Sequence, residues 1–418
     1  MIAEKFLSFI IKNTHKKYFR LKESNKENHI KLLEAEKSKN YPLYIHIPFC
    51  EELCPYCSFN RYAYKEEITK EYFKYLRKEI NLYKDFGFTF KELYIGGGTP
   101  TIDMKELEKL IYLLKSNFPI QTISVETNPN HLTNTNLSIL KQLEVNRLSV
   151  GVQSFDNNIL KSMKRYDKYG SSEKIKNSIK MATNYFNTLN IDMIFNFPDQ
   201  TIEMLEKDLN TLLDLDVGQV TYYPLMPSTN TNKAIKKIWD KISYKKEKTF
   251  YYTIVDKLSY KLKQTTVWCF SKNNSLIDEY IVNTDEYVGL GSGAFGYLKG
   301  SIYINEFSIQ RYINKLKDGI LPNLFKKEFT IKEQTQYDFL IKLFGKNLNI
   351  ENINNRYSIN FLKYFKKELF FFNTINGIRI DDKNISLKRK GLYYWLIMMR
   401  EFFINVNNFR DYCRQTYS

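Results

Sequence analysis

Six short apolar segments alternate with longer amphipathic stretches over residues 43–226, and this alternation constrains the fold more than any other feature. The apolar segments cover residues 43–47, 92–98, 123–129, 147–154, 190–198 and 219–226. In the first intervening stretch apolar residues recur at helical spacing, at Tyr72, Leu76, Ile80 and Tyr83. Strands that alternate with helices predict an α/β fold with a parallel sheet wrapped by helices, either a barrel or a doubly wound sheet.

Each predicted strand ends in an unusual polar or glycine-rich cluster. In chain order these clusters are three cysteines, GGGTP, ETNPN, GVQSF, a D-x-I-x-N-x-P segment and YPLMPS. In parallel α/β folds the functional site lies at the carboxyl ends of the strands. We therefore expect the six clusters to gather on one face of the molecule.

The remaining sequence predicts further regions on both sides of this core. Helix-like, Lys/Glu-rich sequence precedes the first strand without the Arg/Ser bias of a transit peptide. From Thr330 onward, helices, a hairpin-like segment and the apolar "LYYWLIMMREFF" predict a small winged-helix-like domain. We expect an N-terminal helical extension at 1–40, a core at 41–230, a connecting region that closes the core at 231–325, and the winged-helix-like domain at 326–418.

Composition and charge limit the class of protein. No apolar run approaches the roughly 20 residues that cross a bilayer, and the N-terminus lacks a small-residue cleavage site, so we expect a cytoplasmic protein. The net charge of +17 makes nucleic acid a candidate partner. The lysines are nevertheless scattered along the chain, and a basic pocket for an anionic small molecule accounts for the charge equally well.

Three of the five cysteines, Cys50, Cys54 and Cys57, lie in one short loop after the first predicted strand. An odd number of cysteines in a long chain argues against a disulfide framework, which leaves metal or redox chemistry. A structural zinc site needs four ligands, and Cys269, Cys413 or His46 would have to supply the fourth without any spacing signal. A [4Fe-4S] cluster normally has four cysteine ligands, so three leave one iron open for a substrate or cofactor.

The C-x3-C-x2-C spacing, with the aromatic Tyr56 before the last cysteine, resembles the signature of the radical SAM superfamily. The resemblance implies that the open iron chelates S-adenosylmethionine (SAM). One electron from the cluster then cleaves SAM and yields a 5′-deoxyadenosyl radical, so the radical is generated by the cofactors and not by a protein side chain. The electron would come from a donor such as flavodoxin or ferredoxin.

The segments "YIHIPFC", "GGGTPT", "ETNPN", "NRLSVGVQSF", "NIDMIFNFPDQT" and "GLGSGAFGY" are similar to those of the HemN-like branch, which contains oxygen-independent coproporphyrinogen III oxidase and its relatives. This resemblance covers about residues 41–307 and, more faintly, the C-terminal domain. It implies a partial (βα)6 radical SAM barrel and an anionic tetrapyrrole substrate, haem or porphyrin. It also implies a radical SAM enzyme that acts as an oxidoreductase or methyltransferase.

Matching positions carry the family's site residues onto this chain. Cys50, Cys54 and Cys57 would bind the cluster. The SAM molecule on the cluster would be contacted by Tyr44, Gly97 and Glu126. A second SAM site would be lined by Tyr56, Gly98, Thr99, Gln153, Arg165 and Asp192. Taken singly, each polar residue is more typical of a structural role, and Arg165 could pair with a surface carboxylate.

The chain departs from two branches of the family. The decarboxylating oxidases continue the last cysteine as C-x-C, whereas Ser58 and Phe59 follow Cys57 here. The haem chaperones carry an H-N-x-x-Y-W motif in their second half, whereas all four histidines here, at 15, 29, 46 and 131, lie in the first third. We therefore expect anaerobic modification of a tetrapyrrole, with a second SAM as a possible methyl donor.

Other readings stay open at this point. They are oxidative decarboxylation of coproporphyrinogen III, haem carriage without turnover, and a basic nucleic-acid-binding protein with structural zinc. His46 is either a structural strand residue or lies near the substrate. Cys269 is expected to be a packing residue, with a substrate-facing thiol as the alternative.

Overall fold

The computed structural model describes residues 4, 7, 8, 22, 23, 36, 39–239, 242–272, 282 and 284–417. Most of the predicted N-terminal extension, including His15 and His29, lies outside the described residues.

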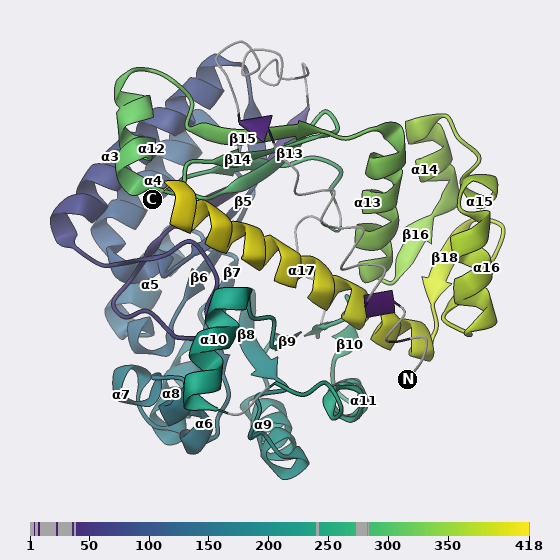
Figure 1. The fold of residues 1–418 in the computed structure, drawn as a ribbon. Coiled ribbons are helices and arrows are strands. Elements are labelled where there is room, and N and C mark those ends of the chain that lie inside the picture. Colours follow the sequence, from purple (N-terminus) through teal and green to yellow (C-terminus); the bar gives the residue numbers. More distant parts are fainter. Residues whose placement is uncertain are drawn as a thin grey trace.

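All six predicted strands form, and they lie side by side in chain order within one nine-stranded sheet (Figure 1). They are β2 (Asn40–Ile47), β5 (Thr89–Gly97), β6 (Thr122–Thr127), β7 (Arg147–Gln153), β8 (Thr188–Phe195) and β9 (Gln219–Pro224). Each pairs in parallel with the next. The prediction of an α/β fold with a parallel sheet is confirmed.

Short strands extend this sheet at both edges, and the sequence analysis did not predict them. β12 (Val288–Leu290) pairs in parallel with β2. At the other edge β11 (Cys269–Ser271) pairs antiparallel with β9, and β10 (Lys263–Gln264) pairs antiparallel with β11. The complete sheet is therefore mixed, in the order β10-β11-β9-β8-β7-β6-β5-β2-β12.

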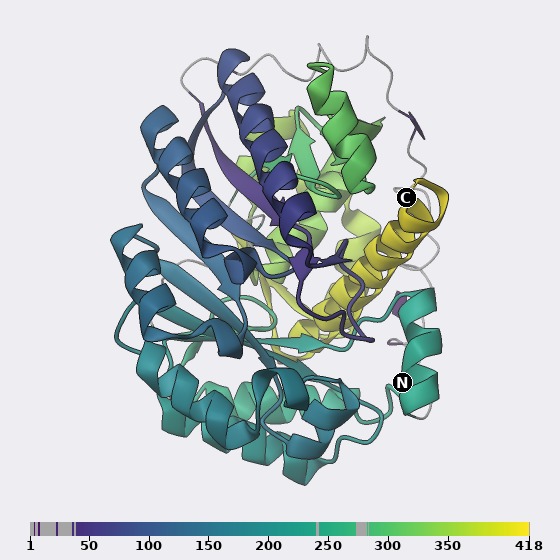
Figure 2. The same ribbon diagram turned by 90° about the vertical axis from the view of Figure 1, so that its left-hand side faces the viewer.

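Helices connect the parallel strands and cover one face of the sheet (Figure 2). They are α3 (Glu66–Asp85), α4 (Met104–Asn117), α5 (Asn134–Gln142), α6 (Asn157–Ser162), α7 (Tyr166–Tyr169), α8 (Ser172–Ala182) and α9 (Ile202–Leu215). The predicted stripe of Tyr72, Leu76, Ile80 and Tyr83 on α3 is buried. Burial of such apolar stripes against the sheet is what fixes the helices in place.

A second sheet has the order β1-β15-β14-β13, and all its strands except β1 follow the core in the chain. Its strands are β1 (Lys22–Glu23), β13 (Phe295–Leu298), β14 (Ser301–Asn305) and β15 (Asn323–Glu328). The same part of the chain contains the helices α10 (Thr229–Ile238), α11 (Glu247–Leu258) and α12 (Ile309–Lys317).

The "GLGSG" segment between β12 and β13 is held against the carboxyl end of β2. The buried Tyr72 hydroxyl donates to the carbonyl of His46 at 2.7 Å and accepts from the amide of Ser292 at 2.9 Å. Glu79 accepts the amide of Gly291 at 2.9 Å and the hydroxyl of Tyr312 at 2.5 Å. These bonds anchor the connecting region on α3.

The C-terminal region contains helices and a three-stranded sheet of order β16-β18-β17. In chain order its elements are α13 (Ile331–Phe344), β16 (Asn347–Asn349), α14 (Ile350–Tyr357), α15 (Phe361–Tyr364), α16 (Lys366–Thr374), β17 (Ile378–Ile380), β18 (Asn384–Leu387) and α17 (Arg389–Tyr417). The predicted hairpin is the β17–β18 pair. The four domain boundaries and the winged-helix assignment stay predictions.

Helix α17 extends well beyond the apolar stretch from which it was predicted, and in Figure 1 it crosses in front of the large sheet. Trp395 is fully buried, and its indole donates to the carbonyl of Leu340 at 3.0 Å. Farther along the helix, Arg400 forms a buried ion pair with Glu247 of α11. One helix therefore joins the C-terminal region to the connecting region. None of the described helices combines the length and the apolar character needed to cross a membrane.

We predict that Trp395→Ala lowers the free energy of unfolding by roughly 3–5 kcal/mol, because it leaves a cavity between α17 and α13. The measurement is urea-induced unfolding followed by circular dichroism. Tyr412→Ala is the matched control on the same helix, because Tyr412 is 51% exposed, and it should cost about 1 kcal/mol or less. Equal losses in the two variants would contradict the docking role of Trp395.

A second prediction concerns the pH dependence of stability. Burial raises the pKa of Glu79 to about 7, so the folded protein keeps a proton that the unfolded chain releases above its ordinary pKa of 4.5. Stability should therefore fall as pH rises from about 4.5 to 7, with Glu79 contributing up to roughly 3 kcal/mol of that fall.

Glu79→Gln should flatten this part of the stability profile when unfolding is measured at several pH values. Exposed Glu67→Gln on the same helix should leave the profile unchanged. An unaltered slope in Glu79→Gln would show that the carboxyl group does not titrate in this range.

Candidate functional site

The three clustered cysteines lie in a tightly closed loop at the carboxyl end of β2. A two-residue strand β3 (Phe49–Cys50) pairs in parallel with β4 (Tyr62–Ala63), and the amide of Tyr64 donates to the carbonyl of Cys50 at 2.8 Å. Inside the loop the amide of Cys57 donates to the carbonyl of Cys54 at 3.2 Å. Cys50 is buried and the other two thiols are half-buried.

A chain of side chains connects the sulfurs of Cys50 and Cys54. The Thr99 hydroxyl lies 3.7 Å from Cys50 Sγ and accepts the Asn128 amide at 2.7 Å. Asn128 Oδ1 in turn accepts from Arg165 Nη2 at 3.2 Å, and Arg165 Nη1 lies 3.7 Å from Cys54 Sγ. The segments after β5 and β6 and the turn between α6 and α7, which holds Arg165, therefore converge on the cysteine loop.

The guanidinium of Arg165 is 3% exposed and organises this part of the site. It lies 3.3 Å from the Tyr56 hydroxyl and 4.1 Å from the centroid of the Tyr169 ring, and it also donates to the carbonyl of Gly151. Arg165 is therefore a buried cation beside a thiol. The alternative in which it pairs with a surface carboxylate does not match this position.

Glu126 and the GGG segment form a second group at the same sheet edge. Glu126 accepts the Tyr94 hydroxyl at 2.8 Å and the amide of Gly97 at 3.0 Å. A Cβ atom at Gly96 would lie 2.6 Å from Glu126 Oε1, and one at Gly98 would lie 2.5 Å from the Phe49 carbonyl oxygen. Only glycine therefore allows the backbone to pass this close to the carboxylate and the cysteine loop.

His46 is a structural residue by its contacts. Its Nδ1 accepts the Tyr44 hydroxyl at 2.7 Å, and its Nε2 donates to the carbonyl of Asn60 at 2.8 Å. Burial lowers the pKa of His46 to about 4, although the bond to Asn60 opposes this, so the ring is neutral at physiological pH. Both ring nitrogens are used, which fits the structural alternative.

Gln153 and Asp192 belong to the next two strands. Gln153 ends β7, has a left-handed backbone with φ of 77°, and folds its side chain back toward Gly151. Asp192 lies within β8, opposite Gly151 in the β7–β8 register, and accepts the Ser149 hydroxyl at 2.7 Å. Arg165, by contrast, lies between α6 and α7.

The positions after Cys57 are occupied by contacts with distant parts of the chain. Ser58 is buried, with its hydroxyl 3.0 Å from that of Thr231 on α10. Phe59 is 43% exposed; its carbonyl accepts from Arg414 of α17 at 2.7 Å, and the Arg410 guanidinium lies 4.7 Å from its ring centroid. The C-terminal helix therefore rests on the cysteine loop.

The remaining cysteines are buried elsewhere. Cys269 lies on β11, where the Thr221 hydroxyl is 3.8 Å from its sulfur, and Cys413 is on α17. Within the described residues, no three His, Cys, Asp or Glu side chains converge on one metal-ion position.

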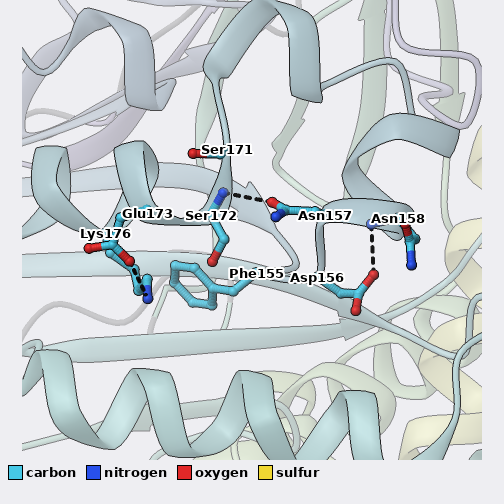
Figure 3. A pocket seen from close by; sticks show the side chains of 8 residues that line it. All are labelled: Phe155, Asp156, Asn157, Asn158, Ser171, Ser172, Glu173 and Lys176. Carbon is cyan, nitrogen blue, oxygen red and sulfur yellow. Dashed lines mark hydrogen bonds and ion pairs between the residues drawn. The ribbon is translucent and has the colours of Figure 1, made fainter.

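A separate polar hollow is present at the N-terminal ends of α6 and α8 (Figure 3). It is lined by Phe155, Asp156, Asn157, Asn158, Ser171, Ser172, Glu173 and Lys176. Its side chains bond one another, as in the 2.8 Å bond from the Ser172 amide to Asn157 and the 2.7 Å Lys176–Glu173 ion pair. It contains none of the predicted site residues.

Comparison with known proteins identifies the family. The model of the radical SAM superfamily matches residues 44–212. The haem chaperone HemW of Bacillus subtilis is 31% identical over 314 residues, which cover 72% of this chain and 82% of the chaperone. This chain belongs to the HemN/HemW family of radical SAM proteins.

Other HemN/HemW relatives are similar over most of the chain. The oxygen-independent coproporphyrinogen III oxidase of Helicobacter pylori is 27% identical over 359 residues, covering 78% of this chain and 77% of the oxidase. The solved structure of coproporphyrinogen III oxidase (HemN) from Escherichia coli superposes with a TM-score of 0.78 at 21% identity, over 91% of this chain and 94% of that one. The shared fold extends through the C-terminal elements.

Membership in the radical SAM superfamily implies a [4Fe-4S] cluster and SAM. The residues present fit such a cluster, because three thiols share one pinned, half-buried loop and leave one iron without a protein ligand. Burial raises the pKa of the Cys50 thiol to about 11, so iron would displace a proton when it binds. The SAM contacts of the individual residues stay predictions.

Sequence reasoning overlooked Asn128 and Tyr94 as members of the site. Asn128 stands inside the quoted ETNPN segment, so its position at a strand end was a usable signal. Tyr94 lies within β5, two residues before Gly96, where strand alternation brings both residues to the same face as Glu126.

We predict that anaerobically reconstituted Cys54→Ala loses the iron, the sulfide and the visible absorption of a [4Fe-4S] cluster. Cys269→Ala is the matched control and should keep all three, because Cys269 is buried on β11 away from the loop. Iron and sulfide assays with an ultraviolet-visible spectrum measure the outcome. A bound zinc ion in the wild-type protein, or an intact cluster in Cys54→Ala, would contradict the assignment.

Proposed function

We propose that this chain is a haem-carrying radical SAM protein that binds haem beside a cluster held by Cys50, Cys54 and Cys57. The observation that carries the proposal is the similarity to the haem chaperone of Bacillus subtilis, which spans 82% of that protein. Phe59 supports it, because this position after the third cysteine lacks the additional thiol of the decarboxylating oxidases.

This proposal reverses the order of preference reached from the sequence. The absence of a histidine motif in the second half of the chain had favoured tetrapyrrole modification over carriage. The comparisons favour the chaperone reading instead, and a haem protein can use cysteine, methionine or tyrosine in place of histidine.

The described histidines limit how haem would be held. Ligation by His46 would break its two buried hydrogen bonds, to Tyr44 and Asn60. His131 has partners at both nitrogens, the Thr101 carbonyl at 3.0 Å and Glu51 at 3.2 Å. We therefore propose that the iron of haem is not held by His46.

The residues around the cysteine loop have distinct proposed roles in holding cluster and SAM. Glu126, fixed by Tyr94 and Gly97, would accept bonds from the ammonium group or ribose hydroxyls of SAM. Arg165 would balance the negative charge of the thiolates from within the protein. When bound, the cluster supplies one electron to SAM. A one-electron donor such as flavodoxin or ferredoxin would then reduce the cluster again.

A second candidate function is modification of the tetrapyrrole. Gln153, Arg165 and Asp192 are three of the six residues that the resemblance assigns to a second SAM site, with Tyr56, Gly98 and Thr99. The similarity to the coproporphyrinogen III oxidase of Helicobacter pylori also covers 78% of this chain. Methyl transfer needs the second SAM, whereas decarboxylation is disfavoured by Ser58 and Phe59.

One experiment separates these functions. Wild-type protein with a reconstituted cluster is titrated with haem and then incubated, reduced and anaerobic, with SAM and either haem or coproporphyrinogen III. We expect tight haem binding, seen as a shifted Soret band, with haem recovered unchanged.

Each other result points to a different function. Formation of S-adenosylhomocysteine with a methylated product would indicate methyl transfer, and carbon dioxide would indicate decarboxylation. Salt-sensitive binding to polynucleotide without SAM cleavage would favour the nucleic-acid alternative. Absence of haem binding at micromolar haem would refute the proposed carriage.

A further inference from the structure

Arg61 donates hydrogen bonds to the backbone carbonyls of two of the three cysteines in the loop. Its Nη2 donates to the carbonyl of Cys54 at 2.6 Å and to that of Cys57 at 2.7 Å. Its Nε donates to the same Cys57 carbonyl at 3.2 Å. A planar guanidinium makes this fork without reorganising, whereas a lysine ammonium does not match it.

One nitrogen of the guanidinium takes no part in these hydrogen bonds. Arg61 Nη1 is buried and has no hydrogen-bond partner. A buried N–H without an acceptor costs about 1–3 kcal/mol, and more when the group is charged, so Nη1 calls for a partner that the described residues do not supply. Arg165 on the opposite side of the loop has the same property at its buried Nε.

The charge of Arg61 is also uncompensated by carboxylates. In the part of the chain that the structure describes, Arg61 forms no ion pair, although Glu51 and Glu52 lie in the same loop. Glu51 faces His131, and Glu52 is exposed to solvent. The other groups of the loop that can become negative are the cysteine thiols, which would lose their protons when iron binds.

A purely structural role for Arg61 explains only its hydrogen bonds to the Cys54 and Cys57 carbonyls. Capping of a tight turn accounts for the bonds to the two carbonyls, and a neutral donor could make similar bonds. It does not account for the buried, unpartnered N–H or for a cation that lacks a carboxylate. Both observations are explained if the guanidinium faces an anionic cluster.

We propose that Arg61 is a positioning residue for the [4Fe-4S] cluster and that its positive charge raises the reduction potential of that cluster. The proposal rests on the cluster that the proposed function requires. Reduction adds one electron, taken from an external one-electron donor, to the oxidised cluster, and no bond forms or breaks. The added negative charge is stabilised by a cation held within the loop, as hydrogen bonds and net charge near a cluster set its potential.

The test is a redox titration of the reconstituted protein with dithionite, followed by electron paramagnetic resonance, without SAM or haem. Three variants are compared with wild type, namely Arg61→Gln, Arg61→Lys and Lys168→Gln. Lys168 is the control cation, because its Nζ reaches the Glu52 carbonyl of the same loop at 3.5 Å from the half-exposed surface.

We expect Arg61→Gln to shift the reduction equilibrium at least tenfold toward the oxidised cluster, which is 59 mV for one electron. Arg61→Lys should keep the wild-type midpoint but lose iron several-fold faster to a chelator, because it keeps the charge and loses the fork. Lys168→Gln should keep wild-type iron retention and shift the midpoint by less than Arg61→Gln, since Lys168 is half-exposed and solvent screens its charge.

A fully loaded Arg61→Gln protein with the wild-type midpoint would overturn the inference. If Arg61→Gln folds but holds no iron, Arg61→Lys decides the question: a wild-type midpoint supports the electrostatic role, and failure to hold iron there as well overturns it. A loaded wild-type protein that binds no haem would refute the proposed carriage and leave the Arg61 comparison intact, because the titration contains no haem.

Discussion

Parallel pairing of β2 and β5 to β9 is the constraint on which the rest of the structure depends. It brings the carboxyl ends of six strands, separated by helices in the chain, to one edge of one sheet. The link from Asn128 through Thr99 to the cysteine loop exists only because β5 and β6 end at the same level, and Arg165, between α6 and α7, completes it. No single segment of the sequence could build this arrangement alone.

Charge organises the site as much as topology does. Three thiols share a small loop, and two guanidinium groups approach it, Arg61 from just after the third cysteine and Arg165 from the start of α7. Each guanidinium is fixed by carbonyl or amide oxygens, so neither side chain loses much freedom when a negative group arrives. The surface lysines that give the chain its net charge play no comparable role.

Much of this arrangement could be predicted from the sequence, because it depends on local patterns. The spacing of Tyr72, Leu76, Ile80 and Tyr83 and the strand-end clusters reflect burial and parallel topology, and both are confirmed. The strands β10, β11 and β12 could not be predicted, because they have two or three residues each and form only against the completed sheet.

The hydrogen bonds between the site residues were harder to predict than the identities of those residues. Glu126, Gly97 and Arg165 stood out by residue type and position, yet the links through Tyr94 and Asn128 depend on distances between strands. The reach of α17 was also unpredictable, because its second half is largely polar and docks through side-chain hydrogen bonds, such as Arg414 to the Phe59 carbonyl, and through Phe409 against Phe325.

The contact between α17 and Phe59 has a consequence for biogenesis. Arg414 and Phe59 are 355 residues apart in the chain, and the contact supports the loop that carries the three thiols. During synthesis on the ribosome the cysteine loop emerges before α17, so this support arrives later. Until α17 docks, the thiols are on a loop that is only partly supported, so iron is expected to enter after α17 has been made.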